Sequence, residues 1–441
     1  MKTLKVKIDH LTKEAIGVAH IEKKPFYIKY AIDNEYIDAI IDYEGKKQVY
    51  GTIKEIIEPA PFRCDPKCNV YYKCGGCHLS HMNYGTQLFF KQHQVKKVYS
   101  LVGFDKINVY PCEGMKNPYF YRNKVQVPVG KKNGKIIAGF FKENTHEIIP
   151  YDNCLVQDEL SNKIIKEVCY AMKENRIEPY DEDAKTGIVR HILIRRAAKE
   201  TMLVLITKVD SFPGRNNLVN SIKKRLPEIT TIVQNVNKRV TNVILGEKEN
   251  ILFGKGFIKD ALCGITFKIS PKSFYQINKS QCEKLYTKAI ELASLTGKET
   301  VLDAYCGIGT IGMIASKKAK EVYGVEIVED AIMDAIKNAK DNNITNCHFY
   351  CADAEDFIKE MKAKIDVVFV DPPRKGCSTS FLKSLVYNKP KKIVYISCNP
   401  ETQANDVKYL VEHGYHFDSV YPFDMFPQSY HVESIVLLER K

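Results

Sequence analysis

Short alternating or β-branched runs fill the N-terminal stretch of the chain and predict a small β domain. The expected strands cover residues 4–8, 20–22, 26–29, 36–43 and 48–56. Turn signals at Gly17, at Asp33 and Asn34, and at Gly45 separate them. About five strands within residues 1–58 predict an OB-like barrel, a fold that often binds nucleic acid.

The middle of the chain, residues 59–270, is expected to form an α+β domain. Strand-like runs cover 124–129, 136–141, 191–195, 202–207 and 231–235, and helical runs cover 160–172 and 218–225. A helix over 84–102, with the apolar stripe Leu88, Val95, Val98 and Leu101, is expected to pack on the C-terminal domain. Aromatic and basic residues mix over 119–124, as on a surface for single-stranded RNA, but a solvated strand edge explains this mixture equally well.

Strands and helices alternate in the last part of the chain, residues 271–441. The expected strands are 300–304, 321–326, 347–350, 366–371, 392–396 and 434–438, and the expected helices are 311–319, 330–342, 354–362, 378–387 and 402–413. A further helical stripe begins at Cys282. This alternation predicts a doubly wound, mostly parallel sheet, so the whole chain is expected to be a multidomain α/β protein.

Composition adds a charge preference to this picture. The net charge of +13 favours a polyanionic partner such as nucleic acid, although lysine-rich surfaces are also common in AT-biased genomes. No apolar run is long enough to span a membrane, and the first residues alternate instead of forming the apolar core of a signal peptide. We therefore expect a cytoplasmic protein with no membrane contact. Fourteen cysteines in so large a cytosolic chain indicate metal binding or catalysis more than disulfides.

One loop concentrates cysteines at spacings that suit a metal centre. Cys68, Cys74 and Cys77 follow a C-x5-C-x2-C pattern. Thiolates spaced in this way bind zinc or an iron–sulfur cluster, and both centres normally take four ligands. Cys64 is the nearest candidate for the fourth ligand, and Cys154 is a more distant one.

Acidic residues follow the first strands of the predicted parallel sheet. The first strand ends in DAYCGIGT (303–310), whose two glycines allow the backbone to approach a ligand at a helix N-terminus. Glu326 ends the next strand, where it can accept hydrogen bonds from ribose hydroxyls. Asp353 follows the third strand, where it can meet an adenine amino group. This pattern favours S-adenosylmethionine over a nicotinamide cofactor.

Two further strand ends bring reactive groups to the same edge of the sheet. Asp371 begins the rigid Asp-Pro-Pro-Arg loop, in which Arg374 suits an oxyanion or a phosphate better than a stacked ring. Cys398 follows the strand 392–396. A thiolate there would add to C6 of uracil and so make C5 nucleophilic, and a general base would then remove the C5 proton. Glu433 is our candidate base, because the strand period places it on one side with His431.

Six motifs together resemble one family. They are CNVYYKCGGC (68–77), FYQIN (274–278), DAYCGIGT (303–310), DPPRKG (371–376), SCNP (397–400) and FPQSYHVE (426–433). The chain resembles the RNA 5-methyluridine methyltransferases, and more narrowly the bacterial 23S ribosomal RNA (uracil-5-)-methyltransferases that carry a TRAM domain and a [4Fe-4S] cluster. The resemblance implies a TRAM barrel over 1–58, a central RNA-binding domain over 59–270 and a Rossmann-like class I methyltransferase domain over 271–441.

The resemblance also implies roles for single residues. Matches to the cluster ligands are Cys68, Cys74, Cys77 and Cys154, which leaves Cys64 as an extra cysteine. Matches to the cofactor-binding positions are Gln276, Tyr305, Glu326 and Asp371, with weaker matches at Thr310 and Asp353. Cys398 matches the nucleophile and Glu433 the base. The chain departs from the family pattern at Thr310, where the best-known members have Asn, and at Ser429, where Thr is usual.

The expected function is therefore S-adenosylmethionine-dependent methylation of uridine C5 in 23S ribosomal RNA. The target uridine is expected to be flipped out or taken from a loop, and the protein to be a monomer. One alternative is a tRNA uracil-5-methyltransferase with the same chemistry. Another is a non-catalytic, cluster-bearing RNA-binding protein. A third, an enzyme that methylates amino groups, would need no cysteine at position 398.

Overall fold

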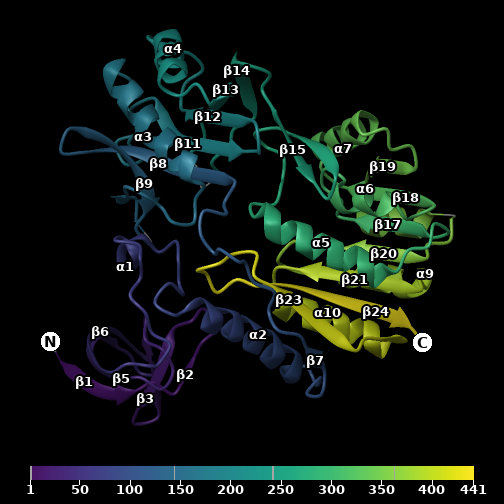
Figure 1. Ribbon diagram of the computed structural model, residues 1–441. Coiled ribbons are helices and arrows are strands. Elements are labelled where there is room, and N and C mark those ends of the chain that lie inside the picture. The colour runs from purple at the N-terminus through teal and green to yellow at the C-terminus, as the bar shows by residue number, and fades with distance from the viewer. Residues whose placement is uncertain (1, 144, 241–242, 362) are drawn as a thin grey trace.

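The computed structural model describes residues 2–143, 145–240, 243–361 and 363–441. The described residues form three large sheets and one two-stranded sheet. Figure 1 shows the large ones at the N-terminal end of the chain, in the middle and at the C-terminal end. Strands of mixed direction and helices make up the last two, so the protein has a multidomain α/β fold with mixed sheets. No helix among the described residues combines the length and the apolar character needed to cross a membrane.

The N-terminal sheet has six strands. Their order is β1 (Thr3–Lys7), β5 (Tyr36–Glu44), β6 (Val49–Glu58), β4 (Lys24–Ile28), β3 (Gly17–Ile21) and β2 (His10–Leu11). Phe26 and Ile28 lie in its fully buried core. Gly51 lets β6 approach β5 closely, because a Cβ at this position would lie 2.2 Å from the carbonyl oxygen of Ile40. All the strands predicted for this stretch are present, and β2 is the one that the pattern did not predict.

The central sheet has seven strands, flanked by α3 (Glu159–Glu174) and α4 (Arg215–Arg225). Their order is β10 (Ile148–Pro150), β9 (Lys135–Phe141), β8 (Lys124–Lys132), β11 (Val189–Arg196), β12 (Thr201–Thr207), β13 (Thr231–Val236) and β14 (Lys248–Phe253). One face of this sheet packs on α3 and α4. The other face shares a core with the small hairpin β15 (Ile258–Leu262) and β16 (Ile265–Ile269) and with the C-terminal part of the chain. Burial on both faces explains why β12 is almost entirely apolar, whereas β11 is equally buried but contains Arg190, His191 and Arg195.

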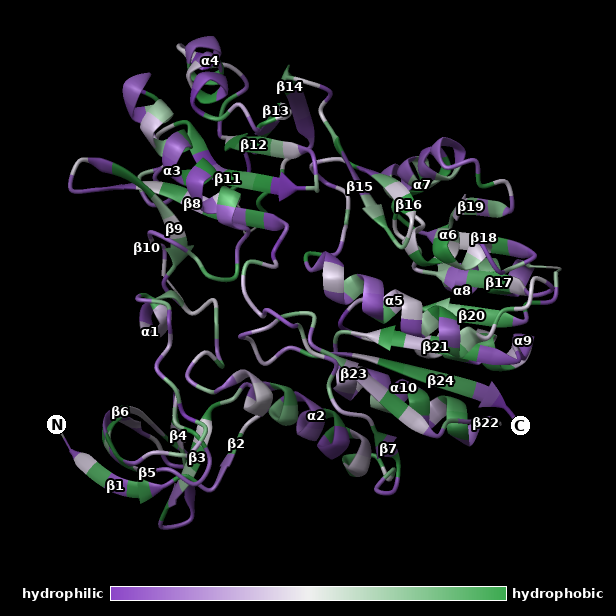
Figure 2. Cartoon of the chain, in the orientation of Figure 1, coloured by the Kyte–Doolittle hydropathy of each residue, from purple (hydrophilic) through white to green (hydrophobic). Residues whose placement is uncertain are grey.

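The C-terminal sheet has parallel strands at its centre. Its order is β19 (Cys347–Cys351), β18 (Glu321–Glu326), β17 (Thr300–Ala304), β20 (Val367–Val370), β21 (Lys392–Ser397), β24 (Glu433–Arg440), β23 (Ser419–Phe423) and β7 (Asn108–Val109), and β22 (Tyr415–His416) pairs with β24 off this path. Strands from β19 to β21 are parallel, and β24 is antiparallel to β21. The hydropathy colouring of Figure 2 shows the apolar character of β20 and of most of β21.

Helices cover both faces of this sheet. α5 (Lys279–Ala293), α6 (Thr310–Ser316) and α7 (Glu329–Asp341) pack into the core on one face. α8 (Ala354–Glu360), α9 (Thr379–Asn388) and α10 (Pro400–Glu412) pack into the core on the other. The predicted helix 354–362 corresponds to α8, and position 362 lies outside the described residues. The predicted strands were found here, whereas the short strands β7, β22 and β23 were not predicted.

Two helices precede the central sheet, α1 (Tyr71–Cys74) within the cysteine loop and the longer α2 (Tyr84–Leu101). α2 packs on α10, and the hydroxyl of Tyr99 donates a hydrogen bond of 3.1 Å to the side-chain oxygen of Gln403. Gln403 also donates to the carbonyl oxygens of Tyr395 and Ser434, so one buried side chain links α2 to β21 and β24. The N-terminal part of the chain is thereby fixed to the strands that carry Cys398 and Glu433.

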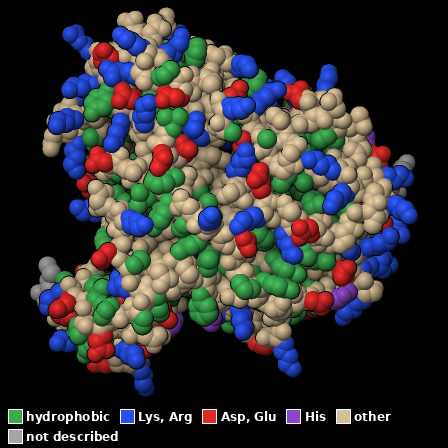
Figure 3. All heavy atoms as spheres, in the orientation of Figure 1, with side chains coloured by type: hydrophobic (Ala, Val, Ile, Leu, Met, Phe, Trp, Pro, Cys, Tyr) green, Lys and Arg blue, Asp and Glu red, His purple; other side chains and the backbone are tan. Residues whose placement is uncertain are grey.

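Figure 3 shows the distribution of charge on one face of the molecule. Lysine and arginine side chains are spread over the whole visible face instead of gathering in a single patch. Acidic side chains lie among them. The positive net charge of the chain is therefore a property of the general surface on this face, and it does not by itself locate a binding site.

Candidate active site and cysteine cavity

Cys398 and Glu433 come from neighbouring antiparallel strands. β21 pairs with β24 as far as Ser397 and Ser434, so Cys398 and Glu433 are the next residues at the same end of this pair. Glu433 acts electrostatically on the Cys398 thiol, so the two groups are close together. Glu433 is buried, with 5% of its surface exposed, and Cys398 is half-buried. Strand pairing therefore brings together a thiol and a carboxyl group that lie far apart in the sequence.

Burial dominates the electrostatics of this pair. It raises the pKa of the Cys398 thiol to about 11, and the nearby Glu433 adds to the increase. It also raises the pKa of Glu433 to about 8, with a further contribution from Asp371. The guanidinium group of Arg374 opposes both increases in pKa, because it stabilises negative charge on either group. Its position beside both groups was not predicted from the sequence.

The loop after β20 carries Asp371 and Arg374. Burial raises the pKa of Asp371 to about 7. The carbonyl oxygen of Arg374 accepts hydrogen bonds from the side chains of Asn399, at 2.9 Å, and Thr402, at 3.3 Å. These bonds hold the loop against the start of α10, directly after Cys398. The guanidinium group therefore comes from a loop that is fixed next to the thiol.

The glycine-rich turn after β17 has the strained backbone that a close ligand approach requires. Tyr305, Gly307 and Gly309 all have positive φ, at 64°, 55° and 78°. Gly309 is required sterically, since a Cβ there would lie 2.6 Å from the ring of Phe349. Thr310, half-buried, is the first residue of α6, so the turn leads into a helix N-terminus.

Two predicted acidic residues lie at the ends of the next strands. Glu326 accepts hydrogen bonds from the backbone N–H groups of Gly307, at 3.3 Å, and Val328, at 3.1 Å. Asp353 caps α8 by accepting from the N–H of Glu355 at 2.8 Å. Both carboxylates therefore have local structural partners, and each keeps further acceptor capacity for a ligand.

Asp303, near the end of β17, is a buried carboxyl group that was not among the predicted site residues. One of its oxygens accepts from the N–H of Gly312 at 2.7 Å, and the other has no protein partner. Burial raises the pKa of Asp303 to about 7, and the nearby Asp371 and Glu326 add to the increase. Asp303 therefore links the glycine-rich turn electrostatically to the Asp371 loop.

Gln276 reaches the same region from the segment before α5. Its side chain hydrogen-bonds to Tyr286, which lies near Asp371. The backbone carbonyl oxygen of Gln276 accepts a hydrogen bond of 3.0 Å from the side chain of Asn123, which lies directly before the central sheet. Neither Tyr286 nor Asn123 was a predicted site residue. Neither residue belongs to a recognisable motif in the sequence, and only the fold brings the two close to Gln276.

One expectation about the end of the chain is wrong. The segment 426–433 does not open the last strand, because β24 begins at Glu433 and residues 424–432 form a loop. Gln428 in this loop has a φ of 71°. His431 lies against Tyr430 and Phe426, with ring centroids 4.4 and 5.9 Å away. The strand period therefore cannot place His431 on the same side as Glu433.

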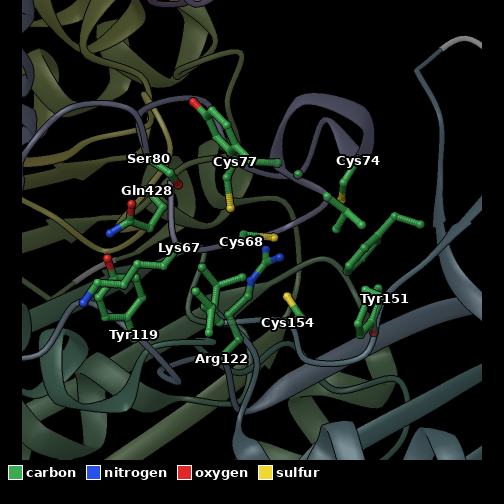
Figure 4. Close-up of a pocket in the computed structure, with 16 residues that line it drawn as sticks. Lys67, Cys68, Cys74, Cys77, Ser80, Tyr119, Arg122, Tyr151, Cys154 and Gln428 are labelled. Atoms are coloured by element: carbon green, nitrogen blue, oxygen red, sulfur yellow. The ribbon is translucent and has the colours of Figure 1, made fainter. Parts of the chain in front are cut away.

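The four cysteines matched to cluster ligands line one cavity, shown in Figure 4. They are Cys68, Cys74, Cys77 and Cys154. The thiol of Cys64 lies elsewhere and donates to the carbonyl oxygen of Ser80 at 3.6 Å. Within the described part of the chain, no three or more His, Cys, Asp or Glu side chains are close enough together to hold a metal ion. The fold thus gathers the four thiols around one space without closing them into a ligand set.

The whole chain has similar known proteins. Residues 83–441 match the sequence profile of the family described as tRNA (Uracil-5-)-methyltransferase. Uncharacterised RNA methyltransferases from Halalkalibacterium halodurans and Staphylococcus epidermidis are 43% and 44% identical, over 444 and 442 residues, and in each case 99% of this chain and 97% of the relative are covered.

A solved structure is similar over the full length. It is the crystal structure of the Pyrococcus abyssi tRNA (uracil-54, C5)-methyltransferase in complex with S-adenosyl-L-homocysteine. The TM-score is 0.80 at 28% identity, and the match covers 99% of this chain and 100% of that one. The arrangement of all three sheets therefore has a counterpart in a solved protein.

The raised pKa of Glu433 predicts a pH-dependent cost in stability. Between its ordinary value of 4.5 and about 8, the folded protein holds a proton here that the unfolded chain has lost, so stability falls as pH rises. Glu433→Gln removes this loss. At about 1.4 kcal/mol per pKa unit, we expect the variant to gain on the order of 4 kcal/mol over the wild type between pH 5 and pH 9.

Urea unfolding from pH 5 to pH 9 measures this difference. Glu412→Gln, an exposed position on α10, is the matched control and should unfold in parallel with the wild type at every pH. Parallel curves for Glu433→Gln as well would show that the carboxyl group is ionised at ordinary pH in the folded protein.

Proposed function

The chain belongs to the tRNA (uracil-5-)-methyltransferase family of RNA methyltransferases, as its motifs predicted, and from this premise we propose that it methylates C5 of a uridine in 23S ribosomal RNA through a covalent adduct with Cys398. The observation that carries this proposal is that Cys398 and the buried Glu433 lie close together at one end of the β21–β24 pair. A nucleophile and a base on one strand end are what uracil C5 chemistry needs.

The reaction divides between these two side chains. The thiolate of Cys398 forms a bond to C6 of the uracil ring, and the electrons of the C5–C6 double bond shift so that C5 becomes nucleophilic. S-adenosylmethionine, when bound, supplies the methyl group that C5 takes up. Glu433 then removes the proton from C5, the C5–C6 double bond forms again, and the thiolate leaves.

The electrostatics of the site suit these roles. A pKa of about 8 places Glu433 near the working pH, where a general base is most effective. Arg374 favours the thiolate of Cys398 against the effect of burial. The bond from Asn399 to the carbonyl oxygen of Arg374 keeps this positive charge beside the thiol.

The cofactor would bind along the carboxyl ends of β17, β18, β19 and β20. The residues that would hold it are Gln276, Tyr305, Thr310, Glu326, Asp353 and Asp371. The strand order β19-β18-β17-β20-β21-β24-β23, with antiparallel β24 and helices on both faces, supports a Rossmann-like class I methyltransferase domain over 271–441. Open sheets of this kind bind ligands at the strand ends that these residues occupy.

The remaining parts of the chain would bind RNA. We assign residues 1–58 to a TRAM barrel and residues 59–270 to a central RNA-binding domain. The Tyr119–Lys124 segment supports the second assignment, because Asn123 connects it to Gln276 at the cofactor edge. A target base inside a helix would be out of reach, so the uridine would be flipped out of a loop, and the enzyme would act as a cytoplasmic monomer.

The cysteine cavity would hold a [4Fe-4S] cluster on Cys68, Cys74, Cys77 and Cys154. The donor set supports this choice, since four soft thiols line one cavity and no carboxylate or imidazole side chain lines it. Cluster binding would require these thiols to move together from their present positions. No step of the methyl transfer needs a redox centre, so we assign the cluster a structural role.

A tRNA substrate is the second candidate. The solved protein that is similar over the whole chain, including the N-terminal sheet, acts on a tRNA uridine. A barrel at the N-terminus therefore does not by itself distinguish an rRNA enzyme from a tRNA enzyme.

Substitution of the two catalytic groups tests the covalent route. We expect Cys398→Ala to abolish both methylation and the covalent complex with 5-fluorouridine RNA. Glu433→Gln should cut turnover at least 100-fold while the covalent complex with unmodified RNA accumulates, because elimination waits for proton removal. Gel retardation under denaturing conditions measures the complex, and its persistence in Cys398→Ala would rule out this nucleophile.

The substrate is tested by mapping 5-methyluridine in RNA from a strain that lacks the gene. Loss of the modification from 23S ribosomal RNA, with tRNA unchanged, is the expected result. Methylation of unmodified rRNA and tRNA transcripts by the purified protein provides the matched comparison. Loss from tRNA alone would replace the rRNA proposal by its alternative.

The cluster is tested by colour and metal content after anaerobic purification. We expect a brown protein with about four iron atoms and four sulfides per chain. Cys154→Ser should lose the colour, and Cys64→Ser should keep it, because Cys64 lies outside the cavity. A colourless protein with one zinc ion would assign the cysteines to a zinc site.

A further inference from the structure

The loop between β23 and β24 is anchored along its backbone. Five consecutive backbone carbonyl oxygens, from residue 424 to residue 428, each accept a hydrogen bond from a residue outside the loop. Four of these carbonyl groups accept from side chains: Asp424 from Gln281 (3.1 Å), Met425 from Asn278 (3.1 Å), Phe426 from Lys91 (3.1 Å) and Pro427 from Tyr121 (3.0 Å). The carbonyl group of Gln428 accepts from the backbone N–H groups of His78 (2.7 Å) and Leu79 (3.0 Å). We refer to residues 424–428 as the anchored loop.

The anchored loop leads directly to the candidate base. Phe423, before the loop, pairs with Glu433, after it, across the β23–β24 hairpin. Four of the five residues in the loop are buried, so their carbonyl groups need protein partners in place of water. Each of these hydrogen bonds therefore helps to fix the path of the chain that leads into Glu433. The loop connects to β23, which lies on the other side of β24 from β21.

Among the donors to the anchored loop, Lys91 is positively charged. Its side chain and that of Asp424 are both completely buried and form an ion pair. The carboxylate of Asp424 also accepts a hydrogen bond of 2.8 Å from the hydroxyl of Tyr84, the first residue of the helix that contains Lys91. α2 thus holds the start of the anchored loop through the carboxylate and its middle through the carbonyl oxygen of Phe426.

A buried ion pair is a poor way to gain stability, because its desolvation offsets most of its attraction. An apolar pair of the same volume would serve folding at least as well. What an apolar pair cannot do is fix both a carboxylate and a carbonyl oxygen at defined positions. The geometry of Lys91 therefore suits a role in placing the loop more than a role in holding the fold together.

We propose that Lys91 is a positioning residue for proton removal, holding Glu433 in place through Asp424 and the anchored loop. This inference rests on the proposed function, in which Glu433 takes the C5 proton. Lys91 touches neither cofactor nor substrate in this assignment. Its loss should leave the addition of Cys398 and the methyl transfer intact and slow the elimination that follows.

The test uses Lys91→Met, which keeps the length of the side chain and removes its charge. A misplacement of about 1 Å at a reacting group costs on the order of 100-fold in rate, so we expect kcat to fall by about that factor while KM for RNA stays near the wild-type value. The covalent complex with unmodified RNA should accumulate. The complex with 5-fluorouridine RNA should form at the wild-type rate, because its formation precedes proton removal.

Two further variants separate positioning from folding. Lys97→Met, an exposed lysine on the same helix, is the matched control and should behave as the wild type in both assays. Lys91→Met combined with Asp424→Asn removes the unpaired buried charge. We expect this double variant to recover thermal stability and still to turn over slowly.

The outcomes are distinct. Recovery of turnover together with stability in the double variant would show that the ion pair only supports folding, and would overturn the proposal. Equal losses of 5-fluorouridine adduct and of turnover in Lys91→Met would overturn it as well. Failure of the wild-type protein to form any adduct would instead remove the proposed function itself.

Discussion

The pairing of β21 with β24 is the constraint on which the site depends. It is an antiparallel pair at the end of an otherwise parallel run, and its register ends at Ser397 and Ser434, directly beside Cys398 and Glu433. A shift of either strand by one residue would turn the side chains of that strand to the other face of the sheet. The buried Gln403, which accepts from Tyr99 and donates to the carbonyl oxygens of Tyr395 and Ser434, reinforces this register from one side. The other parts of the chain add charged residues and loops around these two strand ends.

The N-terminal part of the chain is fixed to the same place. Lys13 in the N-terminal sheet forms an ion pair of 2.9 Å with Glu401, three residues after Cys398. Tyr430 packs against a small apolar cluster that contains Ala15, Ile32 and Leu79. Exposed ion pairs add little stability, so the apolar cluster contributes most of this attachment. The N-terminal part of the chain is therefore held close to the strand ends that lie beside Cys398 and Glu433.

The sequence predicted much of the fold because local patterns decided it. The strands 300–304 and 321–326 have the predicted bounds, since short β-branched runs between turn signals mark strands locally. The predictions failed where contacts with distant parts of the chain determine which side chains are buried. In α2, Leu101 was predicted to face the core but is 77% exposed, whereas Lys91 is completely buried. The partner of Lys91 is Asp424, more than three hundred residues away, and no local pattern reveals such a pair.

Gln428 shows how the two unusual regions of the protein are joined. Its carbonyl oxygen accepts from His78 and Leu79, which directly follow Cys77, and its side chain and N–H bond to the side chain of Gln87. Gln428 also lines the cysteine cavity. Any change in the cysteine loop must therefore shift either this carbonyl oxygen or the two N–H groups bound to it. Because the same loop runs on to Glu433, backbone hydrogen bonds link the segment after Cys77 to the chain that enters Glu433, our proposed base.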